Sequence, residues 1–233
     1  MSTEAEIFQR LARGGSATTS TIMTGKGVRK HFMNGPKPVV GEGVYVGRAF
    51  TISYLPARED VTTKDTYRDD HSIMAALELV PEGAMVIIDC HGDKVSGTVG
   101  EMLLTYIRRK KVAGLITDGS VRDIAGLRRA GLPIWATAVG APEAIYGLHY
   151  QGYQATVGCG GVRVVPGDIV VADEDGVVVV PDAMAEQISL EVEEKCNYEV
   201  FVLAKISEGR GVKGLYPASD ATQREYDAWK KTA

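Results

Sequence analysis

Three polar residues are spaced so that they could bind a small anion and a metal ion together. Arg122 and Asp123 end the segment Thr117–Asp123, where an apolar strand is predicted to turn into a helix. Glu101 lies earlier, with twenty residues between it and Arg122, at the predicted start of the preceding helix. A guanidinium can clamp a carboxylate through two hydrogen bonds, and hard divalent cations prefer carboxylate oxygens. This spacing indicates a catalytic site for a small anionic substrate with a divalent cation.

Two glycines precede the same helix, in the segment Gly97–Leu103. The first turn of a helix has N–H groups without an intrahelical partner, and glycine lets an anion approach them closely. The spacing is neither a Walker A loop nor Gly-x-Gly-x-x-Gly, which argues against a nucleotide or dinucleotide. A tight strand-to-helix turn without a ligand explains these glycines equally well.

Each polar residue also has a purely structural explanation. Asp123 is well placed to cap the helix predicted to begin at Ile124. Glu101 could be a first-turn carboxylate that the helix dipole favours. Taken singly, these explanations outweigh the catalytic one. They are less convincing jointly, because the carboxyl ends of neighbouring parallel strands meet at one edge of a sheet, where ligands bind.

Short apolar strands alternate with helices in the centre of the chain. Strands are predicted over 84–88, 112–116 and 134–139, and helices over 102–111 and 124–130. This alternation predicts parallel pairing with right-handed crossovers. The continuous apolar character of the strands predicts a sheet that is covered on both faces.

The N-terminal part is predicted to be mainly helical. Thr3 and Glu6 have the spacing of a capping box for a helix that ends at Gly14-Gly15, and a further helix is predicted over 16–34. A strand is predicted over 44–52, with a bend at Gly47.

The C-terminal part switches to closely spaced β segments, predicted over 162–165, 169–172 and 177–180. Asp182 is predicted to cap a long helix that runs to about Ser207. We expect a single domain over residues 1–210 and a C-terminal tail or inter-subunit arm over 211–233.

The charge and composition of the chain argue against several kinds of partner. The net charge of −4 argues against a nucleic-acid partner, which would require a basic field. No apolar run approaches the length of a membrane span, and the N-terminus lacks a signal-peptide pattern. Three cysteines, without a zinc-like spacing, predict free thiols in a reducing compartment. We therefore expect a cytoplasmic protein with no membrane partner.

One acidic cluster, Asp69-Asp70-His71, is better explained as the solvated start of a helix than as a metal site. Adjacent residues on a helix point in different directions, so these three side chains would not converge on one ion.

Two motifs resemble the RraA-like superfamily, which includes the class II 4-hydroxy-4-methyl-2-oxoglutarate/4-carboxy-4-hydroxy-2-oxoadipate aldolases. The first consists of Gly100-Glu101 with Asp118–Asp123, and the second runs from Gly160 to Pro181. Ser16–Ser20 and Val46–Thr51 match the N-terminal signature of the family more loosely. The similarity spans residues 10 to 210.

The resemblance implies an α/β fold, an α/β/β/α sandwich of the swivelling β/β/α type with a central parallel or mixed sheet. It also implies homotrimers or homohexamers with sites between subunits. Asp123 would bind Mg²⁺ or Mn²⁺ largely through waters, and Glu101 would assist those waters. Glu199, on the long C-terminal helix, would be an acid contributed by a neighbouring subunit. The pyruvyl carboxylate would be held by Arg122 and by the backbone amides of Gly100, Glu101, Met102 and Leu103.

The implied activity is that of a carbon–carbon lyase. A divalent-metal-dependent pyruvate aldolase would cleave 4-hydroxy-2-oxo di- or tricarboxylic acids to pyruvate. Decarboxylation of oxaloacetate would be a side activity, because it passes through the same enolate. The alternative is a non-catalytic RraA-like regulator that binds a protein partner such as ribonuclease E. In that branch the aspartate after the arginine is replaced, so Arg122-Asp123 favours the enzyme.

This chain departs from the aldolase pattern at two positions. The aldolases usually have aspartate where this chain has Glu101, whose side chain is one methylene longer. Their N-terminal signature usually ends in serine-aspartate, whereas Ser20 is followed here by Thr21.

Overall fold

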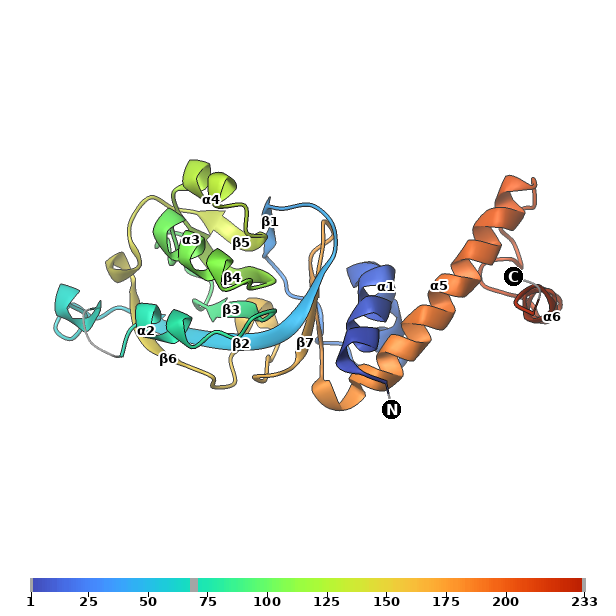
Figure 1. Ribbon diagram of the computed structural model, residues 1–233, viewed down its shortest axis with the longest axis horizontal. Helices are drawn as coiled ribbons and strands as arrows, with labels where there is room; N and C mark the ends of the chain where they lie inside the picture. The colour runs from blue at the N-terminus through green and yellow to red at the C-terminus, as the bar shows by residue number, and fades with distance from the viewer. Residues whose placement is uncertain (1, 68–70, 232–233) are drawn as a thin grey trace.

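Eight strands form one curled, mixed sheet in the computed structural model (Figure 1), which describes residues 2–67 and 71–231. The strand order is β1-β5-β4-β3-β2-β7-β8, and β6 also pairs with β2.

The strands are β1 Lys37–Val40, β2 Tyr45–Pro56, β3 Met85–Asp89, β4 Gly114–Val121, β5 Ile134–Val139, β6 Leu148–Tyr153, β7 Ile169–Ala172 and β8 Val177–Val180. The α-helices are α1 Glu4–Gly25, α2 Ile73–Glu78, α3 Glu101–Arg109, α4 Ile124–Ala130, α5 Ala185–Ser207 and α6 Asp220–Trp229. Short 3₁₀ turns are η1 Lys64–Tyr67, η2 Ala144–Tyr146, η3 Cys159–Gly161 and η4 Asp182–Met184.

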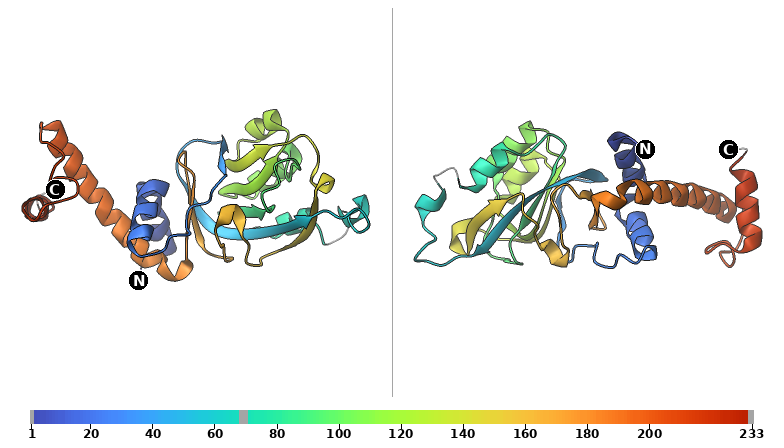
Figure 2. Two further views of the ribbon diagram at one scale, coloured as in Figure 1. Left: turned by 180° about the vertical axis from the view of Figure 1, so that it is seen from behind. Right: turned by 90° about the horizontal axis from the view of Figure 1, so that it is seen from below.

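The expected α/β/β/α sandwich is confirmed by the way the strands alternate. Strands β2, β3, β4 and β5 are parallel neighbours, and successive side chains of a strand point to opposite faces. In β3, Val86 and Ile88 face the helices α2, α3 and α4, whereas Met85 and Ile87 face β7 and β8. The outer face of β7 and β8 packs against α1 and α5, through Ile169 and Val171 among others. Figure 2 shows these layers from two further sides.

Strand β2 joins the two β layers, because its two halves have different partners. Tyr45–Arg48 pairs with β7 and Ala49–Ser53 pairs with β3. A Cβ atom at Gly47 would lie 2.5 Å from the carbonyl oxygen of Gly83, so only glycine allows the two backbones to approach this closely. Gly47 therefore marks the position at which the strand passes from one layer to the other.

The N-terminal helices match the prediction except at the end of the second one. The capping box of Thr3 and Glu6 is confirmed, and so is the break at Gly14-Gly15, because the non-helical backbone of Gly15 (φ 64°, ψ −172°) divides α1 into two helical halves. The second half follows Gly15 and ends at Gly25. The buried Asp173 carboxylate accepts the N–H and hydroxyl of Ser16 at 2.6 Å each, which anchors the second half of the helix. The helix predicted over 16–34 is therefore wrong beyond Gly25.

Two further local predictions are wrong. Residues 162–165 form only an isolated bridge, Val157 with Val164, because the Val165 N–H bonds to the Asp168 carboxylate and closes a turn. Asp182 does not cap the long helix, whose N-cap is Met184. The carboxylate of Asp182 accepts a hydrogen bond from Arg48 at 2.7 Å instead.

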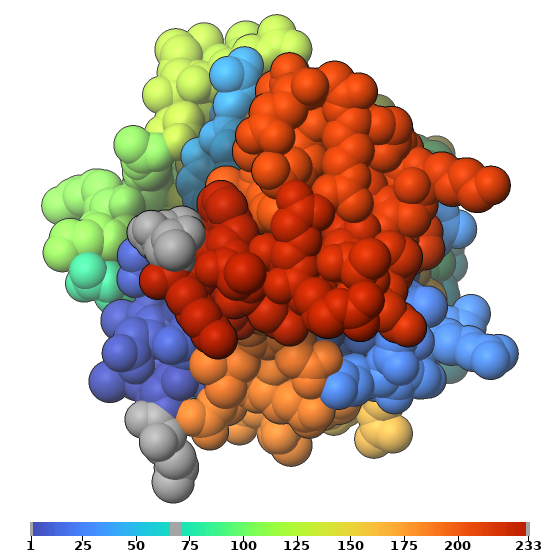
Figure 3. Space-filling model, turned by 90° about the vertical axis from the view of Figure 1, so that its right-hand side faces the viewer, coloured from blue at the N-terminus to red at the C-terminus, as the bar shows by residue number. Residues whose placement is uncertain are grey.

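The described part of the predicted C-terminal segment, residues 211–231, contains helix α6. Helix α6 packs on the end of α5, which projects from the sheet layers (Figure 1), and Figure 3 shows the molecule from the side on which this arm ends. The small core of this arm consists of Phe201, Val202, Leu215 and Tyr226. An inter-subunit contact of this arm stays a prediction. Across the described ranges, no helix is long and apolar enough to cross a membrane.

Candidate active site

Strand β4 is longer than the sequence indicates and carries polar residues to the carboxyl edge of the sheet. All eight residues of Gly114–Val121 are buried, although the prediction ended at Ile116. The Asp118 carboxylate accepts the N–H groups of Cys90 (2.8 Å) and Gly160 (3.2 Å), which satisfies a buried charge. Burial still raises the pKa of Asp118. Asp118 therefore ties β4 to its neighbours and does not face the site.

Asp123 occupies the N-cap position of α4 without capping the helix. Its backbone is left-handed (φ 60°, ψ 45°), and its side chain makes no capping hydrogen bond. Aspartate tolerates this conformation better than most residues. The carboxylate is instead 55% exposed, with Oδ2 at 3.9 Å from Nε of Arg122, and it faces Gly100. The predicted N-cap position of Asp123 is therefore confirmed, but its carboxylate does not cap the helix and is available to a ligand.

The glycines at 97 and 100 are required by close packing against this turn. Gly97 bridges Ser120 of β4, and a Cβ atom on Gly97 would lie 2.8 Å from Cβ of Arg122. A Cβ atom on Gly100 would come closer than 3.0 Å to the Asp123 carboxylate. The first hydrogen bond of α3 joins the Leu104 N–H to the Gly100 carbonyl oxygen at 3.1 Å. The N–H groups of residues 101–103 therefore have no hydrogen-bond acceptor within the helix, and they lie at the positive end of the helix dipole.

A cavity of 520 Å³ lies at this edge of the sheet, within the range of roughly 300–1,000 Å³ that is usual for small-ligand pockets. Of the predicted site residues, it brings together Arg122, Asp123, Gly100, Met102 and Leu103. The other lining residues are Gly97 and Thr98 beside them, and Lys64, Ile73, Met74, Glu143, Ala144 and Ile145 from η1, α2 and η2.

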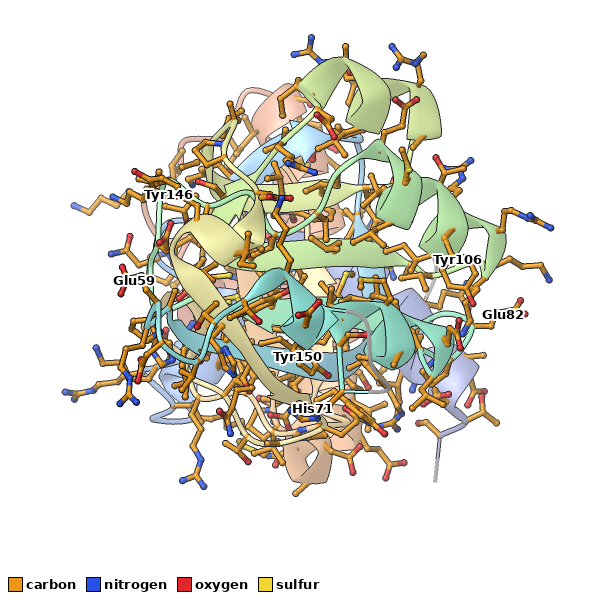
Figure 4. The ribbon with its side chains drawn as sticks, turned by 90° about the vertical axis from the view of Figure 1, so that its left-hand side faces the viewer. Glu59, His71, Glu82, Tyr106, Tyr146 and Tyr150 are labelled. Atoms are coloured by element: carbon orange, nitrogen blue, oxygen red, sulfur yellow. The ribbon has the colours of Figure 1, made fainter. Side chains whose placement is uncertain are left out.

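Lys64 and Glu143 are the ionisable lining residues that the sequence did not single out. Lys64 belongs to η1 and Glu143 is the N-cap residue of η2. No local motif marks either of them, and only the packing of η1, α2 and η2 around the cavity reveals them. Tyr146, also on η2, is 71% exposed and points away from the molecule (Figure 4).

Glu101 starts α3 as expected, but its side chain is not part of the cavity lining. Its carboxylate pairs with Arg129 of α4, at 2.8 Å to Nη2 and 3.2 Å to Nε. A Cβ atom at Gly126 would clash with this carboxylate, so the missing side chain at 126 makes room for it. In this structure Glu101 links α3 to α4, and a role in the water shell of a metal stays a prediction.

Glu199 lies on the projecting part of α5, away from the cavity lining of its own chain. It is 3.7 Å from the Lys195 amino group and accepts a hydrogen bond from the Tyr216 hydroxyl at 3.3 Å. Its contribution to the site of a neighbouring subunit stays a prediction.

The acidic cluster Asp69-Asp70-His71 falls mostly outside the described residues, which exclude 68–70. His71 is described, and its ring packs against Tyr150 with centroids 5.2 Å apart (Figure 4).

The chemistry of the cavity carboxylates fits a hard divalent cation. Within residues 2–67 and 71–231, no group of three or more His, Cys, Asp or Glu side chains could hold a metal ion. Mg²⁺ commonly binds one or two carboxylates and keeps several waters, and hard oxygen ligands suit Mn²⁺ as well. Asp123 would be the protein ligand, with the remaining positions left to water and substrate oxygens.

Comparison with known proteins gives a family match over most of this architecture. A family model described as RraA-like, Aldolase/RraA, matches residues 16–179. The crystal structure of Streptomyces coelicolor RraAS2 superposes with a TM-score of 0.77 at 33% sequence identity, covering 86% of this chain and 97% of that one. RraAS2 is described as an unusual member of the RNase ES inhibitor RraA protein family.

Two curated relatives are more distant. Protein DlpA of Legionella pneumophila is 25% identical over 186 residues, which are 80% of this chain and 29% of DlpA. A protein of Halalkalibacterium halodurans, provisionally named 4-hydroxy-4-methyl-2-oxoglutarate aldolase, is 29% identical over 142 residues. That match covers 60% of this chain and 65% of the relative, so the chain spans less than two thirds of both curated relatives.

Proposed function

We propose that this chain, which belongs to the RraA-like family, is a class II pyruvate aldolase. It would cleave 4-hydroxy-2-oxo di- or tricarboxylic acids to pyruvate with Mg²⁺ or Mn²⁺, and would decarboxylate oxaloacetate as a side activity. The observation that carries the proposal is the Asp123 carboxylate. This carboxylate makes no capping hydrogen bond to α4. It lines a cavity together with Arg122 and residues at the amino end of α3.

The protein groups would hold the 2-oxo acid end of the substrate. Arg122 would bind the carboxylate through its guanidinium fork, and the free amides of residues 101–103 would add hydrogen bonds at the positive end of α3. A cation bound to Asp123 would supply Lewis-acid stabilisation of the charge that develops on the 2-oxo oxygen. A single preorganised electrostatic donor of this kind typically contributes about 3–4 kcal/mol.

The reaction breaks the bond between C3 and C4 of the substrate. Its electron pair stays with C3 and gives the enolate of pyruvate, while the 4-hydroxyl loses its proton and C4 becomes a carbonyl. Glu143 lines the same cavity, and its carboxylate is not engaged with Arg122. We assign it to accept this proton. A proton delivered to C3 then completes pyruvate.

Substitution of Asp123 tests the proposal. Asp123→Asn keeps the left-handed backbone, which asparagine also tolerates, and removes the negative charge. We expect a loss of more than ~100-fold in metal-dependent pyruvate release, with the folded structure retained by circular dichroism. Wild-type turnover rates in this variant, or undiminished turnover of the wild-type protein in excess EDTA, would refute the mechanism.

The second candidate function is a non-catalytic regulator that binds a protein partner such as ribonuclease E. The exposed apolar side chains of the projecting arm favour it, namely Val200 (49%), Leu203 (63%) and Val212 (53%). The same residues support assembly as a homotrimer or homohexamer, which we also propose. Pyruvate release from 4-hydroxy-4-methyl-2-oxoglutarate with Mg²⁺ separates the enzyme from the regulator, and sedimentation measures the assembly.

A further inference from the structure

The cavity contains a second cation, Lys64, in addition to Arg122. Lys64 is exposed and begins the short turn η1 in the segment between β2 and α2. Among the residues that the structure describes, none pairs with its amino group. Arg122 would bind one carboxylate of a ligand, which leaves Lys64 available to bind a second anionic group.

With a divalent cation bound, the net charge of the cavity would match a ligand that carries two negative charges. Arg122 and Lys64 contribute two positive charges, and Asp123 and Glu143 contribute two negative charges. The lining alone is therefore neutral, and a divalent cation on Asp123 would bring the total to plus two. A 2-oxo acid with two carboxylates neutralises that charge, whereas one with a single carboxylate leaves an excess positive charge in a partly desolvated site.

Apolar residues line the same cavity as Lys64. Ile73 and Met74 come from α2, and Ala144 and Ile145 come from η2. Ile73 and Ala144 are 2% and 7% exposed, so they form a fixed wall rather than a mobile rim. Such a wall would pack against the carbon chain that joins two carboxylates.

We propose that Lys64 is a specificity-determining residue, which binds the distal carboxylate of a 2-oxo dicarboxylic acid whose first carboxylate is on Arg122. The proposal rests on the proposed function for the orientation of the substrate. Lys64 takes no part in breaking the C3–C4 bond, and its role is to select dicarboxylic over monocarboxylic substrates.

Binding of a ligand pair that the protein does not cleave tests the inference separately from catalysis. The pair is 2-oxoglutarate and 2-oxopentanoate, which have equal chain lengths and differ in the distal carboxylate. Calorimetry with Mn²⁺ present would compare wild type, Lys64→Gln, Lys64→Arg and the control Lys94→Gln. Lys94 is an exposed lysine outside the cavity lining, so its loss changes the overall charge by the same amount.

We expect wild type and Lys94→Gln to prefer 2-oxoglutarate by about tenfold or more, since a hydrogen bond to a charged group has this magnitude. Lys64→Gln should remove the preference by weakening 2-oxoglutarate alone, and Lys64→Arg should restore most of it. A preference that is absent in wild type, or that survives in Lys64→Gln, would overturn the inference.

A turnover measurement distinguishes this failure from failure of the proposed function. Pyruvate release would be followed by NMR for 4-hydroxy-2-oxoglutarate and 4-hydroxy-2-oxopentanoate. If neither is cleaved although Lys64 sets the binding preference, the aldolase proposal fails and the binding role stands. If both are cleaved and Lys64→Gln slows them equally, the aldolase proposal stands and the specificity role fails.

Discussion

Replacing Gly100 by alanine tests whether the position of the Asp123 carboxylate is set by the missing side chain at 100. Gly100 has an extended backbone (φ −132°, ψ −173°), which any residue can adopt, so alanine introduces no backbone strain. Its Cβ atom would instead come closer than 3.0 Å to Oδ2 of Asp123, and the carboxylate would have to move. A displacement of about 1 Å at a catalytic group commonly costs ~100-fold in rate, or about 2.7 kcal/mol.

The effect on stability should be much smaller than the effect on the site. Gly100 is the N-cap of α3, and alanine is a poorer N-cap, at a cost of about 0.5–1 kcal/mol. In a chain of this size that cost lowers Tm by only about 1–4 °C. Gly100→Ser has the same Cβ atom but can cap the helix, so it should regain stability without regaining function.

The assay combines Mn²⁺ affinity by calorimetry, kcat/KM for pyruvate release and Tm. Gly211→Ala is the matched control, because its Cβ atom would meet no heavy atom within 4 Å. We expect weaker Mn²⁺ binding and about 100-fold lower kcat/KM in both Gly100 variants, and neither effect in the control. Wild-type Mn²⁺ affinity and turnover in Gly100→Ala and Gly100→Ser would refute the reasoning.

Two further predictions concern carboxylates outside the cavity. Glu101→Gln breaks an ion pair whose side chains are 40% and 65% exposed, so we expect a stability loss below about 1 kcal/mol and a change in Mn²⁺ affinity below about threefold. A tenfold weakening would instead place Glu101 in the water shell of the cation. Burial raises the pKa of Asp118, so ionisation of this group costs stability above that raised pKa, and the cost disappears as the pH falls through it. Wild type should therefore gain Tm relative to Asp118→Asn as the pH falls through the raised pKa towards the ordinary aspartate value of 3.8, and a constant difference in Tm would contradict this.

The layered fold could be predicted from the sequence because its signals are local. Apolar runs at 84–88 and 134–139, separated by amphipathic segments, predicted the parallel strands β3 and β5 and the helices between them. The bounds of β5 and α4 match the prediction at both ends. Caps and periodicity depend on residues a few positions apart, as the confirmed capping box of Thr3 and Glu6 shows.

The errors arose where a distant partner decides the local structure. The polar stretch Asp118-Gly119-Ser120 reads as a loop, yet it is strand, because Asp118 binds the N–H groups of Cys90 and Gly160. Similarly, Asp173 anchors Ser16 across more than 150 residues, at the start of the second half of α1. No pattern within a short window contains these partners.

The sequence by itself determined which residue types stand at the carboxyl edge of the sheet, including the adjacent Arg122 and Asp123. Only the tertiary structure decided where their side chains and those of their neighbours point. A single left-handed backbone at Asp123 turns its carboxylate away from the helix it was expected to cap. The ion pair with Arg129 holds Glu101 outside the cavity, and the packing of η1 and η2 brings Lys64 and Glu143 into it. These outcomes depend on backbone dihedral angles and on contacts between residues far apart in the chain, which spacing along a sequence does not specify.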